Sequence, residues 1–310
     1  MKIAFVFPGQ GSQTVGMLNN WAENQIVTQV IERASAALNQ DMAALIAEGP
    51  AEQLNLTTNT QPVMLAASYA MYQAYVQAGG PQAALMAGHS LGEYSALTAA
   101  GSFSLEDAVR LVRVRADAMQ AAVPVGTGGM AAILGLDDDT VRKVCAEAAQ
   151  SDVVEAVNFN APAQVVIAGH KAAVERACDL AKQAGAKRAL PLPVSAPFHA
   201  SLLKPAADVL EKALSGITIA MPSVDVINNV DVAVAATPEA IRDALVRQAW
   251  HPVRWVETIR AMKQQGVTHV VECGPGKVLS GLVKRIEPEM TGISIYDPAS
   301  LQAALETLKG

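Results

Sequence analysis

Gly88-His89-Ser90-Leu91-Gly92-Glu93 is the stretch of sequence that decides how this chain is interpreted. It contains the G-x-S-x-G pattern, which is typical of a serine on a sharp turn between a strand and a helix. Glycine suits both flanking positions because a backbone bent this sharply leaves little room for a β-carbon. The pattern predicts a nucleophilic hydroxyl at Ser90, and the backbone N–H of Leu91 would face an oxyanion that forms beside it.

The flanking sequence supports this prediction. Residues 83–87 are apolar and short enough for a buried strand, although Ala, Leu and Met have poor β-propensity. Residues 91–100 are rich in helix formers, and Gly101 is a suitable residue to end the helix. A plain helix N-terminus capped by Ser90 would fit the same residues, so the pattern alone leaves both interpretations open.

The composition favours a globular protein with a large core. The 310 residues are 51% hydrophobic and 17% charged, and the net charge of −6 predicts no general affinity for nucleic acid. The three cysteines show no C-x-x-C spacing, which argues against a zinc site or a disulfide framework. The apolar run after Lys2 is too short for a signal peptide, and no apolar stretch is long enough to span a membrane. We therefore expect a cytoplasmic protein without a metal site.

Strand and helix patterns alternate along the chain, which predicts an α/β fold with a largely parallel sheet. Pro62 marks the expected start of one helix, and the Gly79-Gly80 pair marks its end. The expected strands cover residues 2–7, 83–87, 225–227 and 267–272, and the expected helices cover residues 26–38, 62–78, 91–100 and 105–122.

A loop with one proline and three glycines, residues 123–129, interrupts this alternation. The patterns that follow have the order β-α-β-β-α-β, which is that of a ferredoxin-like unit. The sequence therefore predicts two subdomains, a larger catalytic one formed by residues 1–124 and 196–310 and an inserted one formed by residues 125–195. The expected elements of the insert cover residues 130–136, 139–149, 153–159, 164–168, 171–185 and 188–193.

A serine needs a base to become a nucleophile at neutral pH, and five histidines are available. His89 adjoins the serine, but neighbouring side chains at a sharp turn point in different directions, so we expect it to support the turn. His199 lies just past the second boundary of the insert, where a cleft between subdomains would form, and is the preferred base. Alternatively, His199 caps a helix or fills the interface between the subdomains.

No acidic residue stands out as the group that orients the histidine. Asp208, Asp225, Asp231 and Glu272 are all compatible with this role. A backbone carbonyl could serve instead, because the third group mainly fixes the tautomer and the angle of the ring.

The segment Pro8–Ser12 follows the first expected strand and could contribute to oxyanion binding. In hydrolase-like sheets a loop after an earlier strand supplies the second N–H of the oxyanion hole, which here would come from Gln10. A phosphate-binding loop fits less well because no Gly-Lys-Ser/Thr ending follows. The alternative is a turn that only starts a helix.

Arg115 is a charged residue on an apolar helix face. In the helix expected over residues 105–122 it falls between Leu111 and Met119, whereas the other arginines lie outside the apolar sector. An inward guanidinium needs an anion, because an unpaired buried charge costs several kcal/mol. That anion could be a structural Asp or Glu, or a substrate carboxylate bound in bidentate fashion.

Together these segments resemble the malonyl-CoA:acyl-carrier-protein transacylases of bacterial fatty-acid synthesis over essentially the whole chain. As an ordered set the matching blocks are specific, although no single block is. They are Phe7–Gln13, Gly88–Tyr94, Arg115, Asn158–Asn160, the segment ending at His199, Gln248 and Gly274–Gly276. The resemblance implies an α/β-hydrolase-like larger subdomain with a ferredoxin-like insert, in agreement with the order of elements above.

The resemblance also implies a reaction. Ser90 would be the acylated nucleophile and His199 its base, oriented by the main-chain carbonyl of Gln248. Malonyl-CoA would donate the malonyl group to the phosphopantetheine thiol of acyl carrier protein in a ping-pong reaction, without a cofactor, and so supply extender units for fatty-acid synthesis. We expect a monomer that has no nucleic-acid or membrane partner. The rival hypotheses are a serine thioesterase or esterase with the same dyad, and a non-catalytic docking subunit.

The resemblance also implies roles for residues around the nucleophile. The N–H groups of Gln10 and Leu91 would form the oxyanion hole, Arg115 would hold the malonyl carboxylate, and Asn158 would line the cleft. Leu91 and Phe198 resemble malonyl-selective rather than methylmalonyl-selective members, because a bulky ring near the acyl α-carbon could reject an added methyl group. Discrimination of this kind is worth only about 1–3 kcal/mol per methyl-sized change, so we expect it to be incomplete.

Overall fold

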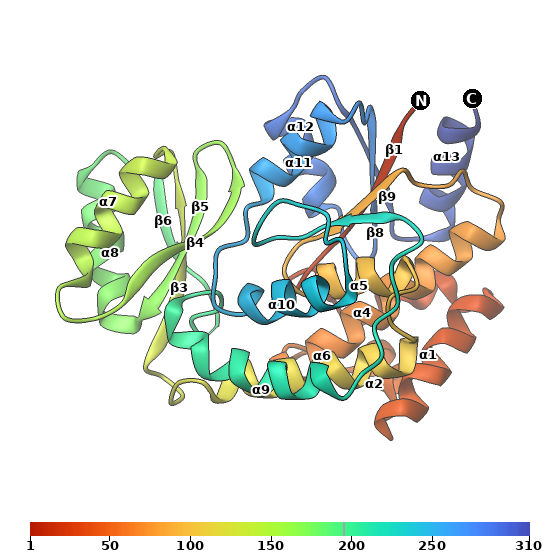
Figure 1. The fold of residues 1–310 in the computed structure, drawn as a ribbon, viewed down its shortest axis with the longest axis horizontal. Helices are drawn as coiled ribbons and strands as arrows, with labels where there is room; N and C mark the ends of the chain where they lie inside the picture. Colours follow the sequence, from red (N-terminus) through yellow and green to blue (C-terminus); the bar gives the residue numbers. More distant parts are fainter. Residues whose placement is uncertain (195) are drawn as a thin grey trace.

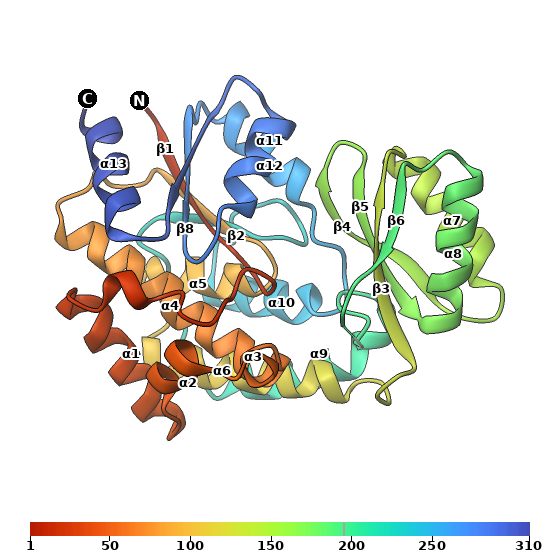
Figure 2. The same ribbon diagram turned by 180° about the vertical axis from the view of Figure 1, so that it is seen from behind.

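The computed structural model describes residues 1–194 and 196–310. These residues form two sheets, each with its own helices, and the two bodies lie side by side (Figure 1). The N- and C-termini lie close together on the larger body, on the side of the molecule away from the smaller one (Figures 1 and 2). The expected boundary between the subdomains at residue 195 falls outside the described residues.

The larger body is built on a parallel sheet with the spatial order β7-β2-β1-β8-β9. Its strands are β1 (Ile3–Phe7), β2 (Leu85–Gly88), β7 (Asp225–Ile227), β8 (His269–Cys273) and β9 (Thr291–Ile295). Strand β1 lies in the centre and is buried along its whole length, as expected for a parallel sheet that helices cover on both faces. The prediction of a largely parallel α/β sheet is therefore confirmed.

Helices of the larger body cover this sheet and continue below it (Figure 1). They are η1 (Asn19–Trp21), α1 (Gln25–Leu38), α2 (Met42–Glu48), α3 (Ala51–Leu54), α4 (Thr57–Gln77), α5 (Leu91–Ala99), α6 (Leu105–Ala121), η2 (Ser201–Leu203), α9 (Lys204–Ser215), α10 (Pro238–Gln248), α11 (Trp255–Gln264), α12 (Val278–Ile286) and α13 (Pro298–Lys309), where η marks a 3-10 helix.

The smaller body has the β-α-β-β-α-β order that the sequence predicts. Its elements are β3 (Gly128–Leu134), α7 (Asp138–Ala149), β4 (Val154–Ala161), β5 (Gln164–His170), α8 (Lys171–Gln183) and β6 (Arg188–Pro191). The strands form an antiparallel sheet with the order β4-β5-β3-β6, and α7 and α8 pack together on one face of it (Figure 2). Ile133, Val141, Val165 and Ile167 belong to a separate apolar core between this sheet and its helices.

Strand β4 joins the two bodies through the backbone. The N–H of Phe159 donates to the carbonyl of Val253 at 3.0 Å, and the N–H of Val253 donates to the carbonyl of Val157 at 2.8 Å. The carboxylate of Glu155 on the same strand accepts a hydrogen bond from the backbone N–H of Ser201 at 2.9 Å. The smaller body is thus tied to two segments of the larger one, the loop before α11 and the start of η2.

The position of Pro62 is the clearest error of the sequence prediction. Helix α4 begins at Thr57, so Pro62 lies inside the helix and not in its first turn. Proline at this position removes one backbone hydrogen bond. Most of α4 is buried around its whole circumference, and this packing outweighs the local cost. The hydroxyl of Thr60 also bonds to the carbonyls of Leu54 and Leu56 at 2.6 and 3.0 Å, which secures the first turn.

Several elements have no counterpart among the predicted ranges, and α2, α3 and β9 show why. Helices α2 and α3 are short, with seven and four residues, and helices of this length carry little periodic signal. Strand β9 has only five residues and includes a glycine, which is depleted in strands. Within the described ranges, no helix is both long enough and apolar enough to cross a bilayer.

Candidate active site

The turn at Ser90 has a strained backbone that its two glycines make possible. Ser90 directly precedes α5 and has φ 52° and ψ −113°. A β-carbon on Gly88 would lie 1.8 Å from the carbonyl oxygen of Gly92, and one on Gly92 would lie 2.0 Å from that of Phe7. Strain of this kind costs about 1–3 kcal/mol and persists only where surrounding contacts enforce it. Ser90 is therefore more than an N-cap, and its side chain makes no capping hydrogen bond.

Ser90 and His199 are in hydrogen-bond contact. Ser90 Oγ lies 2.7 Å from His199 Nε2, and His199 Nδ1 lies 2.7 Å from the main-chain carbonyl oxygen of Gln248. A carbonyl oxygen only accepts, so Nδ1 carries the ring proton and Nε2 is left to accept the serine proton. The arrangement is that of a nucleophile, its base and an orienting group.

The orienting group is a carbonyl, and the four acidic candidates have other surroundings. Asp208 and Asp231 form ion pairs with basic side chains. Glu272 accepts a hydrogen bond from the backbone at the start of α12, and Asp225 is exposed at the start of β7. The alternative of a backbone carbonyl, which the sequence left open, is the one found beside His199.

Burial and the nearby charge of Arg115 lower the pKa of His199 to about 3. Both effects disfavour the imidazolium, the first through loss of hydration and the second through repulsion between like charges. The imidazole is therefore neutral at physiological pH. A neutral ring with a free Nε2 lone pair is the form that can accept a proton from Ser90.

Arg115 points inward from α6, as its place on the helix predicts, and is only 1% exposed. Its Nη1 donates to Gln61 Oε1 at 2.7 Å, and its Nη2 donates to Gln248 Oε1 at 3.0 Å. The same Nη2 lies 3.3 Å from Ser90 Oγ. The guanidinium is thus held beside the nucleophile by uncharged oxygen atoms.

No carboxylate of the described residues forms an ion pair with Arg115, although the buried Glu93 acts on its charge from a longer distance. Within residues 1–194 and 196–310, no Asp or Glu oxygen lies within 4.0 Å of its guanidinium nitrogens. Its Nε is buried without a hydrogen-bond partner in the protein, and its guanidinium lies 5.2 Å from the ring centre of Tyr94. Of the two anions that the sequence allowed, no structural Asp or Glu pairs directly with Arg115 in the described part of the chain.

The predicted site residues meet at one cleft of about 530 Å³. This volume is within the range of small-molecule sites. Ser90, His199, Arg115, Gln10, Leu91 and Asn158 all line it, and Gln248 lies beneath it through its contacts to Ser90 and His199. The described residues contain no cluster of side chains that could hold a metal ion.

The loop at Gln10 lies directly against the serine turn. A β-carbon on Gly9 would come within 2.6 Å of the His89 carbonyl oxygen, and Gln10 Nε2 donates to Thr57 Oγ1 at 3.0 Å. Leu91 is the first residue of α5, so its N–H has no acceptor within the helix. Both residues line the cleft together with Ser90, and the role of their N–H groups in an oxyanion hole stays a prediction.

His89 connects the two bodies. Its Nε2 lies 2.7 Å from Oδ1 of Asn160 on β4, and its ring packs against that of Trp255. Burial lowers its pKa, so the ring is neutral and suited to a structural contact. Asn158 on the same strand has a buried Oδ1 without a hydrogen-bond partner in the protein.

Asn229 is a site residue that sequence reasoning missed. Its Oδ1 accepts from the Ser90 N–H at 2.9 Å, and its Nδ2 donates to the Gly88 carbonyl at 2.7 Å. Gln248 Nε2 donates to the Ser90 carbonyl at 2.9 Å. Two buried carboxamides therefore hold the strained turn on both sides. The only signal in the sequence is the position of Asn229 just after a short strand, at the carboxyl edge of a parallel sheet.

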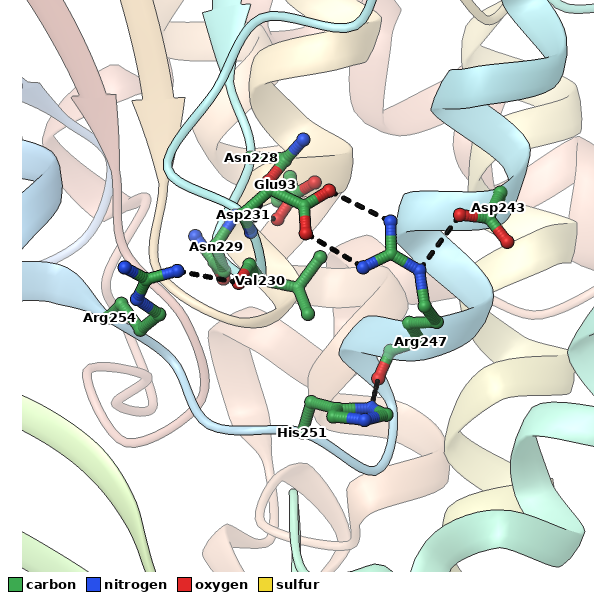
Figure 3. Close-up of polar contacts among 9 residues, drawn as sticks. All are labelled: Glu93, Asn228, Asn229, Val230, Asp231, Asp243, Arg247, His251 and Arg254. Carbon is green, nitrogen blue, oxygen red and sulfur yellow. Dashed lines mark hydrogen bonds and ion pairs between the residues drawn. The ribbon is translucent and has the colours of Figure 1, made fainter.

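The segment that carries Asn229 is fixed by charged groups (Figure 3). Arg247 from α10 donates to both carboxylate oxygens of Asp231 at 2.8 Å, and its Nε donates to Asp243 at 2.8 Å. Arg254 donates to the Val230 carbonyl at 3.2 Å. The contact with Arg247 lowers the pKa of Asp231, which keeps the carboxylate ionised.

Glu93 lies beneath the turn and was not predicted either. It is 2% exposed and accepts hydrogen bonds from the Asn229 N–H at 2.9 Å and from Gln248 Nε2 at 3.0 Å. Burial raises its pKa to about 7, although these hydrogen bonds and Arg115 oppose the shift. Glu93 therefore joins the two carboxamides that hold the turn.

Comparison with known proteins identifies the family. The model for the acyl transferase domain matches residues 4–294 of this chain. The chain belongs to the acyl transferase family. A relative from Escherichia coli strain K12, named malonyl CoA-acyl carrier protein transacylase, is 57% identical to this acyl transferase, and the match covers 98% of this chain and 99% of the relative.

Solved structures agree with this assignment. An acyl-carrier-protein S-malonyltransferase from Burkholderia pseudomallei 1710b has a TM-score of 0.97 and 66% sequence identity to this acyl transferase, covering 99% of this chain and 100% of that one. A malonyl-transacylase solved in complex with a type II PKS acyl-carrier protein has a TM-score of 0.98 and 52% identity over 99% of this chain and 100% of its own. These full-length matches confirm the fold of both bodies.

Replacing Asn229 with Ala is expected to slow the reaction of Ser90 by about 100-fold, because the turn loses two hydrogen bonds and the hydroxyl moves relative to His199. The measurement is the rate at which a fluorophosphonate probe labels Ser90, followed by intact-protein mass spectrometry. Asn20→Ala, which makes the same change at an exposed position on η1, is the control and should react within about threefold of the parent. Equal rates for the parent and Asn229→Ala would contradict the positioning role.

The low pKa of His199 predicts how the same labelling rate depends on pH. A histidine of ordinary pKa, about 6.5, would be protonated and would lose reactivity below that pH. Here His199 should contribute no inflection between about pH 8 and about pH 5, because its buried ring remains neutral, and any inflection near pH 7 in the parent would come from Glu93. Glu93→Gln is measured in parallel, since it removes the titration of the other buried group. An inflection near pH 6.5 in both proteins would contradict the lowered pKa.

Proposed function

We propose that this acyl transferase moves a malonyl group from malonyl-CoA to the phosphopantetheine thiol of an acyl carrier protein through an ester on Ser90. The observation that carries this proposal is the buried guanidinium of Arg115, which lies beside the nucleophile without a carboxylate partner in the described part of the chain. A malonyl group has a carboxylate at the far end from its thioester. Relatives named malonyl CoA-acyl carrier protein transacylase support the choice.

The first half of the reaction forms the ester. Ser90 Oγ attacks the thioester carbonyl while His199 Nε2 accepts the hydroxyl proton. The N–H groups of Gln10 and Leu91 would stabilise the oxyanion of the tetrahedral intermediate. The intermediate collapses with cleavage of the carbon–sulfur bond, and His199 gives its proton to the departing thiolate, which leaves as free CoA.

The second half repeats these steps in reverse with another thiol. His199 accepts the proton of the phosphopantetheine thiol, whose sulfur attacks the ester carbonyl. Collapse of the second intermediate returns the proton to Ser90 Oγ and releases malonyl-acyl carrier protein. The main-chain carbonyl of Gln248 keeps the imidazole in the required tautomer in both halves.

Three residues that line the cleft would hold or limit the acyl group. Arg115 would bind the malonyl carboxylate in bidentate fashion, and Asn158 would offer its unpartnered Oδ1 to a donor on the substrate. Phe198 also lines the cleft and would limit the bulk allowed at the acyl α-carbon. We further infer that residues 1–124 and 196–310 carry the reacting groups and that residues 125–195 form the opposite wall.

The proposed partner is an acyl carrier protein. A related malonyl-transacylase, 52% identical to this chain, has been solved in complex with an acyl-carrier protein, which supports this choice. The chemistry described above needs no cofactor or metal ion. We propose that the protein acts in the cytoplasm as a monomer.

Ser90→Ala tests the proposal directly. After incubation with malonyl-CoA, the parent protein should gain the mass of one malonyl group, and the adduct should disappear when acyl carrier protein is added. The Ser90→Ala variant should form no adduct and transfer no malonyl group. Transfer by this variant would overturn the mechanism. Rapid release of malonate by the parent, without transfer, would instead favour a thioesterase.

Arg115→Ala tests the carboxylate site. We expect kcat/KM for malonyl-CoA to fall by at least about 100-fold, or about 2.7 kcal/mol, because the variant leaves the substrate carboxylate buried and unpaired. The value for acetyl-CoA should fall by less than about 10-fold, since acetyl has no carboxylate to pair. Equal losses for both substrates would show that Arg115 serves only the serine and its base.

A further inference from the structure

We propose that Gln61 sets the acyl-group selectivity of the cleft, because it holds Arg115 with a neutral oxygen and leaves the charge of the guanidinium for the substrate. This inference rests on the proposed function, in which Arg115 binds the carboxylate of the acyl group. It assigns to Gln61 a role in specificity and none in the chemical steps at Ser90.

Gln61 is placed to do this by α4, which passes beneath the cleft. Its side chain is 2% exposed and lines the cleft together with Arg115 and Ser90. Its Oε1 accepts from Arg115 Nη1 at 2.7 Å, and its Nε2 lies 4.0 Å from Met119 Sδ. Because a guanidinium only donates, the carboxamide oxygen of Gln61 must be the atom that faces it.

The second oxygen that holds Arg115 is also neutral. Gln248 Oε1 accepts from Arg115 Nη2 at 3.0 Å, while Gln248 Nε2 donates to Glu93 at 3.0 Å. The amide of Gln248 therefore stands between the guanidinium and the carboxyl group of Glu93. The third acceptor, Ser90 Oγ, is a hydroxyl. All the hydrogen-bond acceptors that the structure gives to Arg115 are uncharged.

Neutral acceptors orient a guanidinium without cancelling its charge. A buried charge that lacks a counter-charge is unfavourable, and this cost is relieved when a ligand brings the missing anion. A malonyl carboxylate relieves it, whereas an acetyl group does not. A carboxylate at position 61 would remove this cost permanently. It would form an ion pair with Arg115 where Gln61 Oε1 now accepts from Nη1. A malonyl group would then meet a neutralised site and a like charge.

The Gln61→Glu substitution tests this because it replaces one side-chain NH₂ by oxygen and keeps the size and shape of the residue. We expect kcat/KM for malonyl-CoA to fall by about 100-fold and kcat/KM for acetyl-CoA to change by less than about fivefold. Both substrates are measured with acyl carrier protein as acceptor. Acyl-Ser90 formation is followed separately by intact-protein mass spectrometry, which shows that the serine and its base remain active.

Two control variants separate charge from other effects. Gln29→Glu makes the same change in net charge at an exposed position on α1 and should keep both rates. Gln61→Met fills the same space without a charge and removes the hydrogen bond, so the guanidinium stays unneutralised. It should keep a preference for malonyl-CoA over acetyl-CoA within about tenfold of that of the parent.

The outcomes are distinct. Loss of the malonyl preference in Gln61→Glu, with the preference kept in Gln61→Met, supports the inference. An unchanged preference in Gln61→Glu overturns it, and so does an equal loss of both activities. A collapse of the preference in Gln61→Met would show that the hydrogen bond, and not the neutrality of the residue, is what matters. If the parent protein forms no malonyl adduct, the proposed function itself fails, and that result does not depend on the variants.

Discussion

The strained backbone at Ser90 is the constraint on which the rest of the catalytic arrangement depends. Its φ of 52° together with ψ of −113° lies outside the regions that L-residues commonly adopt, and Gly88 and Gly92 lack the β-carbons that would prevent it. The hydrogen bonds of Asn229 and Gln248 then hold the peptide groups on both sides of the serine. Because these carboxamides are fully buried, water cannot replace them when they are lost.

Gln248 contacts three parts of the site at once. Its main-chain carbonyl orients His199, its side-chain oxygen holds Arg115, and its side-chain nitrogen holds the Ser90 turn. A shift of this one residue therefore moves the base, the charge and the nucleophile together. Substitutions in such a network are not additive, since each removes support that the others share.

The sequence was sufficient to select the side chains that meet at the cleft, but not the groups that support them. The G-x-S-x-G turn has a local cause, and Arg115 could be placed by its position on one helix face. Asn229 and Gln61 have no such local signal, because their roles exist only after β7 and α4 are brought to the cleft. The same limit explains Pro62, whose place inside α4 depends on burial by neighbouring elements and not on local preference. The group that orients His199 could not be predicted for a related reason. It is the main-chain carbonyl of Gln248, and every residue has such a carbonyl.

The charge of Arg115 has a consequence for His199 as well as for the substrate. The guanidinium disfavours the imidazolium, and this repulsion is one reason for the low pKa of the ring. A base with so low a pKa holds the serine proton weakly. A carboxylate bound to Arg115 would offset the repulsion and raise the pKa of His199, which makes the ring a stronger base when the acyl group carries a charge. On the proposed function, Arg115 would favour malonyl over acetyl groups in two ways, by binding the carboxylate and by strengthening the base beside it. Strengthening of the base requires that no other anion has already neutralised the guanidinium. The uncharged oxygens around Arg115 would therefore support both carboxylate binding and the effect on His199.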